Sequence, residues 1–308
     1  MPPMKESILK TGHSMESVQT FVAGQLDTDP ESLQQLAEGH VSQAFRFMDN
    51  CGEMRVLRLA PQEDDFLKDQ YAANHFKGIP IPRVISIGEY DPETKYCVTN
   101  YVEGVTSDDM TQTQIDNALP NIHKAFADIF HIDIRESSGY GVVSPIDGNG
   151  QFESYEESLI DRINEFSIEE RRAGAIRMEV DPSLVDRFYQ QAINNLTYAS
   201  GTRRVVHGDL GFDNLLMNNS NVAAVIDWAH LQYGDWMDDF SKFDFWWPGR
   251  FGDAHQFAVS HGLEAEHLNE RRAFFWAITG LSTINFADKA KNYHIVEWLN
   301  ENAANKIV

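Results

Sequence analysis

The chain has 308 residues, of which 42% are hydrophobic and 11% aromatic, and a formal net charge of −22. This composition argues against an intrinsically disordered chain, because it supplies enough apolar material for one large core or two smaller ones. The acidic charge argues against nucleic acid as a partner and favours a cationic small molecule. No apolar run approaches the roughly 20 residues of a membrane helix, and the first fifteen residues lack the apolar stretch of a secretory signal. We therefore expect a cytoplasmic protein without a membrane partner, and favour a monomer.

The first third of the chain has the pattern of a small sheet interrupted by helix. A weakly amphipathic helix is expected over residues 15–25, and a second helix over 63–76 from apolar residues at four-residue spacing. Cys97 falls in an apolar strand pattern and is expected to be a buried thiol, and two cysteines cannot define a disulfide framework. The expected strands, separated by turn-forming residues, are 33–37, 44–48, 54–60, 84–88 and 96–101.

After residue 101 helical patterns dominate. Residues 139–150 contain glycine and proline and are expected to form a loop. The sequence thus predicts a strand-rich lobe over residues 1–101, a hinge over 102–106 and a helical lobe over 107–308, and clefts between lobes are favoured ligand sites. The expected elements of the second lobe are helices at 115–130, 155–166, 182–198, 235–247, 268–286 and 295–304, and short strands at 214–217 and 222–226.

The strongest chemical signal is the segment His-Gly-Asp-Leu-Gly-Phe-Asp-Asn at 207–214, followed by Ile-Asp-Trp at 226–228. Asp209 and Asn214 lie on a loop that leads into an expected strand, and a hairpin can return Asp227 beside that loop. Phosphoryl transfer needs a carboxylate that orients or accepts the proton of the attacking hydroxyl, and oxygen ligands that hold Mg²⁺ on the phosphates. These three side chains supply a base and two metal ligands. An isolated His-Gly-Asp could be an ordinary turn. The presence of Asn214 and Asp227 at the required distances from Asp209 in the sequence disfavours that interpretation.

These motifs resemble the catalytic and metal-binding loops of the aminoglycoside phosphotransferase family, relatives of the protein kinases. The resemblance implies an α+β, two-lobed, protein-kinase-like fold, in which a small antiparallel sheet lobe with one helix binds nucleotide and a larger helical lobe holds the catalytic loop and the acceptor site. It implies that Asp209 is the catalytic base, that Asn214 and Asp227 bind Mg²⁺, and that His207 braces the loop. The likeness is greatest to members that phosphorylate hygromycin B, and covers residues 36–39, 56–59, 79–82, 96–98, 103–106, 224–228 and 234–235.

The expected function is that of an ATP- and Mg²⁺-dependent O-phosphotransferase that acts on an aminoglycoside or aminocyclitol antibiotic and confers resistance. A hygromycin B-like acceptor is favoured, and GTP stays open as a substitute for ATP. The alternative is a kinase of another small hydroxylated metabolite or of a macrolide. A catalytically inactive nucleotide-binding scaffold is less favoured, because neither the base nor a metal ligand is missing. A protein kinase is disfavoured, because the short stretch from Asp227 to Gly234 leaves no room for a long activation segment.

Arg58 stands where protein kinases carry a phosphate-binding lysine on the third strand. We expect it to contact the nucleotide phosphates, to offset charge during transfer, and to pair with Asp69 on the following helix, with Asp65 as the alternative. Arginine keeps the charge of lysine but offers a planar fork of donors, so the two are not interchangeable. The alternative is that Arg58 is an outward-facing strand residue.

The remaining contacts are predicted less directly. The phosphate loop is expected at residues 38–44, with Ser42 and nearby backbone N–H groups as contacts. Backbone groups of Asn100 and Val102 are expected to meet the adenine. Carboxylates are the expected device for a cationic acceptor, and among the acidic residues after Asp227 the candidates are Asp238 and Asp239.

Overall fold

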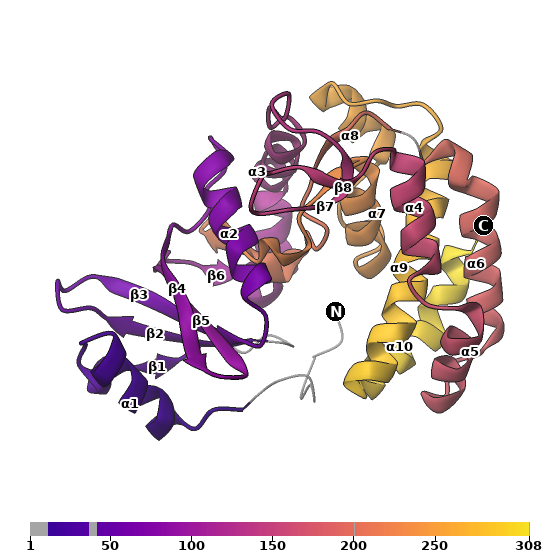
Figure 1. Cartoon of the computed structure of the whole chain (residues 1–308). Helices are drawn as coiled ribbons and strands as arrows, with labels where there is room; N and C mark the ends of the chain where they lie inside the picture. The colour runs from indigo at the N-terminus through magenta and orange to yellow at the C-terminus, as the bar shows by residue number, and fades with distance from the viewer. Residues whose placement is uncertain (1–11, 37–41, 200, 308) are drawn as a thin grey trace.

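The structure is a computed structural model that describes residues 12–36, 42–199 and 201–307, with the first sheet on one side and most of the helices on the other (Figure 1). The strands of the first third form an antiparallel sheet in the order β1-β2-β3-β5-β4. The α+β class and the small antiparallel sheet predicted from the sequence are confirmed. The strands are β1 (Gln34–Gln35), β2 (Gln43–Met48), β3 (Met54–Ala60), β4 (Val84–Asp91) and β5 (Thr94–Asn100).

The two faces of this sheet bury different helices. On one face, Leu57 and Leu59 of β3 pack in a cluster with α1 (Met15–Gln25). On the other face, Ala60 and the buried Cys97 pack against Phe66 of α2 (Glu63–His75). Because side chains alternate along a strand, Arg58 lies on the α2 face, between two residues of the opposite face. The strand period therefore aims Arg58 at α2.

The segment expected as a hinge is bonded to the loop that precedes β10. Val105–Thr106 forms the short strand β6, which pairs with β10 (Leu215–Asn218), and β10 pairs in turn with β11 (Asn221–Val225). Ser107, fully buried, donates from Oγ to the carbonyl oxygen of Phe212 at 2.7 Å. The exact lobe boundaries at residues 101 and 106 stay a prediction.

The helical part of the chain is built around one continuous apolar core. The long helix α9 contacts α5, α6, α7 and α10 and lies at its centre. Two of the helices, α5 and α8, were not predicted, because α5 is strongly polar and α8 is short. A capping box, in which Ser167 and Glu170 exchange hydrogen bonds, was the available signal for α5. The helices are α3 (Gln112–Phe130), α4 (Tyr155–Asn164), α5 (Ile168–Arg177), α6 (Ser183–Asn195), α7 (Met237–Trp246), α8 (Ala254–His261), α9 (Leu268–Ala290) and α10 (Tyr293–Asn302).

The loop expected over residues 139–150 was predicted wrongly, because it contains strands. β7 (Tyr140–Val143) and β8 (Gly150–Phe152) join β9 (Arg204–Val206) and β12 (Gln232–Gly234) in a sheet of order β8-β7-β12-β9. Strands of three or four residues carry too little alternation to be recognised. The structure also contains short 3₁₀ turns at Pro30–Ser32, Ser107–Asp109, Leu196–Tyr198, Phe212–Asn214, Trp228–His230 and Ala303–Lys306.

None of the helices in the described part of the chain combines the length and the apolar character that a membrane span requires.

A buried ion pair connects α9 to the start of α7. Arg271 donates from Nε to Asp235 Oδ2 at 2.7 Å, and also donates to the carbonyl oxygens of Glu264 and Glu266 at 3.1 Å. Asp235 is fully buried and accepts from the backbone N–H of Met237 at 3.0 Å, in the first turn of the helix. Both partners of the ion pair therefore hold backbone groups as well as each other.

Arg271→Met is expected to lower the free energy of unfolding by about 3–5 kcal/mol, because it leaves the Asp235 carboxylate buried without its partner. Urea denaturation followed by tryptophan fluorescence measures this loss. Arg172→Met is the matched control, because the pair between Arg172 and Asp186 is 43% and 48% exposed and should contribute at most about 1 kcal/mol. Equal losses in the two variants would contradict the assigned role of Arg271.

Candidate active site

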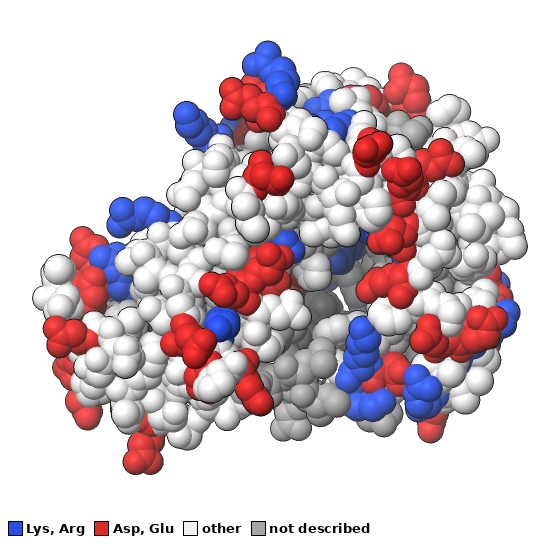
Figure 2. Space-filling view, in the orientation of Figure 1, with Lys and Arg blue, Asp and Glu red and all other residues white. Residues whose placement is uncertain are grey.

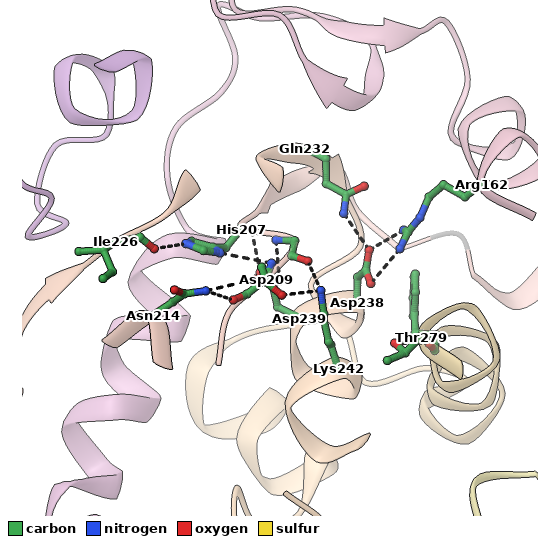
Figure 3. Close-up of polar contacts among 12 residues, drawn as sticks. Arg162, His207, Asp209, Asn214, Ile226, Gln232, Asp238, Asp239, Lys242 and Thr279 are labelled. Carbon is green, nitrogen blue, oxygen red and sulfur yellow. Dashed lines mark hydrogen bonds and ion pairs between the residues drawn. The ribbon is translucent and has the colours of Figure 1, made fainter. Parts of the chain in front are cut away.

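The loop from 207 to 214 is fixed by a glycine and by a carboxylate beneath it. Gly208 has φ +82°, and a Cβ there would lie 2.2 Å from the carbonyl oxygen of His230, so a side chain cannot be accommodated. Asp239 of α7 accepts from the backbone N–H groups of His207 at 2.7 Å and of Gly208 at 2.8 Å (Figure 3). The first two residues of the loop are thus bound to α7.

His207 joins this loop to the end of β11. Its Nε2 lies 3.0 Å from the carbonyl oxygen of Ile226, and the backbone N–H of Asp209 donates to its Nδ1 at 3.3 Å. Burial lowers the pKa of His207 to about 4, so the imidazole is neutral at neutral pH. Because Nδ1 accepts, the proton is on Nε2, which donates to Ile226. His207 therefore braces two segments that are distant in sequence.

Asp209, Asn214 and Asp227 come together where these segments meet. Asn214 Nδ2 donates to the carbonyl oxygen of Asp209 at 2.8 Å and to its Oδ2 at 3.3 Å. The backbone N–H of Ile226 donates to the carbonyl oxygen of Asn214 at 3.0 Å, which brings the next residue, Asp227, alongside. Asp227 has a left-handed backbone, with φ 63° and ψ 65°, which is costly for a residue other than glycine. Asp227 thus follows directly a residue that is bonded to Asn214, and its carboxylate, 41% exposed, lies 3.1 Å from Arg58 Nη2.

The donor atoms of this cluster suit a hard divalent cation. Because the amide nitrogen of Asn214 donates to Asp209, its amide oxygen is the atom left for a cation. One amide oxygen and the carboxylate of Asp227 match the protein contribution to a Mg²⁺ ion that is otherwise bound by phosphates and water. The residues present therefore fit the metal expected from the sequence.

Arg58 lies between two carboxylates from different parts of the chain. Its Nη1 is 2.5 Å from Asp69 Oδ2 and its Nη2 is 3.1 Å from Asp227 Oδ1. Asp69 also accepts from the backbone N–H of Trp228 at 2.8 Å through Oδ1. Although burial acts to lower it, the two carboxylates raise the pKa of Arg58 above its ordinary value. The structure thus pairs Arg58 with Asp69, not with Asp65, and the outward-facing alternative is wrong.

Asp238 and Asp239, the acidic residues expected to bind the acceptor, form hydrogen bonds within the protein instead. Asp239 is fully buried and accepts the two backbone N–H groups described above. Asp238 is 4% exposed and accepts from Arg162 at 2.6 Å and from Gln232 at 3.1 Å. Buried carboxylates with these donors are not available to a ligand, so the expectation that Asp238 and Asp239 bind the acceptor is corrected.

The expected nucleotide contacts are placed only in part. The backbone N–H of Asn100 donates to the carbonyl oxygen of Arg83 at 3.1 Å, so this N–H is not available to adenine, and a contact through the carbonyl oxygen of Asn100 stays a prediction. Val102 is half-buried and stays a candidate. Ser42 is half-buried directly before β2, but residues 38–41 of the expected phosphate loop lie outside the described residues.

Lys242 of α7 was missed by the sequence analysis. Its Nζ lies 2.7 Å from Asp209 Oδ1 and donates to the carbonyl oxygen of Gly208 at 2.7 Å (Figure 3). Although burial opposes it, Lys242 holds the pKa of Asp209 well below its ordinary value, so this carboxylate is ionised at neutral pH. The available signal was a single basic residue in an otherwise aromatic and acidic helix.

Comparison with known proteins shows the family of the chain. The phosphotransferase enzyme family (APH) is matched over residues 32–274. The chain belongs to this family. The predicted membership is confirmed, and with it an enzyme that transfers phosphate to an alcohol group.

Individual relatives give the same result. The hygromycin-B 4-O-kinase of Escherichia coli is 31% identical over 238 residues, which are 75% of this chain and 67% of that protein. The crystal structure of aminoglycoside phosphotransferase APH(4)-Ia is 26% identical with a TM-score of 0.79, over 96% of this chain and 98% of that one. An aminoglycoside 2'-phosphotransferase-IIIa, 16% identical with a TM-score of 0.68 over 95% and 98% of the two chains, shares the fold. The kinase-like fold predicted from the sequence is thereby confirmed.

The buried, neutral His207 predicts how stability depends on pH. Its pKa is lowered from 6.5 to about 4 in the folded chain, so the unfolded chain binds more protons between these values. The free energy of unfolding therefore rises with pH across this interval, and roughly 3 kcal/mol is lost on going from pH 7 to pH 4. Denaturant unfolding at several pH values should show a shallower dependence in His207→Gln, which removes the titration. His255→Gln on the surface of α8 is the control and should keep the wild-type dependence. An unchanged dependence in His207→Gln would contradict this account.

Proposed function

We propose that this protein transfers a phosphate from ATP, with Mg²⁺, to a hydroxyl group of an aminoglycoside or aminocyclitol antibiotic and so confers resistance. Hygromycin B is the favoured acceptor, and GTP is the alternative co-substrate. The observation that supports the proposal is a chain of contacts: Asn214 bonds to Asp209, Ile226 bonds to the backbone of Asn214, and the next residue, Asp227, is paired with Arg58. The relatives support the choice of ligands, because APH(4)-Ia has been crystallised with ADP and hygromycin B. The protein in that complex is 25% identical to this chain, with a TM-score of 0.79 over 94% of this chain and 98% of that one. The proposed compartment is the cytoplasm, where ATP is abundant, and the proposed form is a monomer.

Each side chain has a separate part in this reaction. Asp209, ionised and 40% exposed, orients the acceptor hydroxyl and takes its proton. Asn214 and Asp227 would hold Mg²⁺, which supplies neutralisation of phosphate charge when it is bound. Arg58 holds Asp227 in place with one arm of its guanidinium and Asp69 with the other. Ser42 and Val102 remain the proposed contacts to phosphate and adenine.

The acceptor is drawn to the protein by its overall charge. Acidic side chains outnumber basic ones on the face shown in Figure 2 and lie over both parts of the molecule, and the net charge of the chain is −22. A field of this sign concentrates cations near the site without a dedicated carboxylate pocket. Since Asp238 and Asp239 are engaged elsewhere, a kinase of another hydroxylated metabolite or macrolide is the second candidate.

Mass spectrometry of candidate acceptors after incubation with the protein, ATP and Mg²⁺ tests the proposal. Hygromycin B is expected to gain one phosphate. The panel includes other aminocyclitols, a macrolide, an amino alcohol and simple sugars. Phosphorylation of a non-aminocyclitol acceptor alone would replace the favoured function by the second candidate.

Asp209→Asn is expected to lower kcat about 10²- to 10⁴-fold, because an amide cannot take the hydroxyl proton. A coupled assay of ADP release measures the rate. Asp253→Asn is the control. Asp253 is the N-cap of α8, outside the catalytic loop, and asparagine is as good an N-cap as aspartate. A kcat in Asp209→Asn equal to that of the control would refute the assigned base.

Arg58→Lys is expected to lower kcat/KM for ATP about 10- to 100-fold, although it restores the residue usual in protein kinases. An ammonium cannot hold Asp69 and Asp227 at once in the fork geometry, so one charge-assisted hydrogen bond of about 1.5–3 kcal/mol is lost. Arg55→Lys is the matched control on the same strand, because Arg55 also pairs with two carboxylates, those of Asp49 and Glu53, outside the site. Steady-state kinetics at saturating acceptor distinguish the two, and wild-type values for Arg58→Lys would count against a pocket shaped for the guanidinium.

A further inference from the structure

We propose that Lys242 is a positioning residue for the transfer reaction, whose ammonium group holds the Asp209 carboxylate in the orientation that receives the acceptor proton. This inference rests on the proposed role of Asp209 as base. Lys242 lies on α7 and contacts the catalytic loop from outside it.

The carboxylate of Asp209 is held from two sides. Lys242 Nζ lies 2.7 Å from Oδ1, and Asn214 Nδ2 donates to Oδ2 at 3.3 Å (Figure 3). The backbone on either side is fixed as well, since Asp209 N–H donates to His207 and Asp209 C=O accepts from Asn214. Of these contacts, only that of Lys242 brings a charge to Asp209, and it is the shortest made by the carboxylate.

The contact comes from a helix that already binds the same loop. Lys242 follows Asp239 by three residues, so the two side chains lie on the same face of α7. Asp239 accepts from the N–H groups of His207 and Gly208, and Lys242 donates to the carbonyl oxygen of Gly208. One face of α7 therefore binds three successive loop residues. It contacts the backbone N–H groups of His207 and Gly208, the carbonyl oxygen of Gly208 and the side chain of Asp209. A rigid element that grips a base in this way is an effective means of keeping it in a reactive geometry.

Lys242 and Asp209 are also open to a ligand. Their side chains are 27% and 40% exposed. Both line a small hollow of about 30 Å³, which is enough for a hydroxyl group or a water molecule. The hollow is completed by Leu210, Gly211, Asp213, Trp246 and Trp247. The ion pair thus borders a space that an acceptor hydroxyl can enter, which an ion pair serving only to attach α7 would not need.

The decisive experiment compares Lys242→Met and Lys242→Arg with a control lysine. Lys306→Met is that control, because Lys306 is 5% exposed and donates to the carbonyl oxygen of Asp244 on the same helix at 2.8 Å, away from Asp209. Lys242→Met should lower kcat about 10- to 100-fold and leave KM for ATP within about twofold, because a small displacement of the base slows chemistry and not nucleotide binding. Lys242→Arg should recover part of the rate, because it keeps the charge. Lys306→Met should keep the wild-type kcat, whatever it does to the unfolding temperature.

Two kinetic results would overturn the proposal: a wild-type kcat in Lys242→Met, or a loss of kcat that Lys242→Arg does not relieve. Crystal structures of the wild type and of Lys242→Met give a readout that needs no acceptor. The Asp209 carboxylate should rotate or adopt alternative conformers in the variant, and an unchanged carboxylate would refute the positioning role. If the wild-type protein phosphorylates nothing in the panel, the proposed function fails, and the crystal structures still decide the role of Lys242.

Discussion

The two parts of the molecule are coupled through the guanidinium of Arg58. It bonds to Asp69 on α2 and to Asp227 after β11, and Asp69 bonds in turn to the backbone of Trp228. Two carboxylates this close would repel each other without a cation between them, and the planar fork of arginine can satisfy both at once. Because Asp227 has a left-handed backbone, the same contacts also help to hold a conformation that the chain would otherwise avoid. The position of the proposed metal ligand thus depends on a strand residue almost 170 positions earlier.

The second support of the site is α7, and it explains why this helix buries so much charge. Carboxylates are seldom buried unless hydrogen-bonded donors surround them. On α7 Asp238 meets Arg162 and Asp239 meets two backbone N–H groups, and just before the helix Asp235 meets Arg271. In the sequence these carboxylates resemble a ligand-binding cluster. In the structure they accept hydrogen bonds from other parts of the protein. Of these carboxylates, Asp239 holds the loop that carries Asp209, whereas Asp235 and Asp238 join this segment to α9, α4 and β12.

The sequence predicted the parts of the fold that leave a regular or chemical pattern. The helix at 15–25 and the strand at 54–60 were predicted at their observed bounds, and turn-forming residues precede the strand. The short strands of the β8-β7-β12-β9 sheet were missed, because three or four residues cannot show a period. Within the site, the spacing of Asp209, Asn214 and Asp227 was informative because a loop and a hairpin connect them locally. The roles of Asp239 and Lys242 depend on how α7 packs, which no local pattern records.

The same packing determines what the surroundings of the reacting hydroxyl can recognise. The nearest charged groups to Asp209 include the ammonium of Lys242, and the carboxylates of α7 face inward. The charge of Lys242 is offset by Asp209, with which it is paired at 2.7 Å, and the hollow also contains Asp213, so an amine of the proposed acceptor beside the reacting hydroxyl would meet little net positive charge. If the acceptor is cationic, as proposed, its attraction would depend on the field of the whole protein, which salt screens over about 8 Å under physiological conditions. Orientation of the proposed acceptor would then depend on shape, and of the two tryptophans that line the hollow Trp246 is the more exposed, because Trp247 is 6% exposed and packs against Phe212 and Phe243.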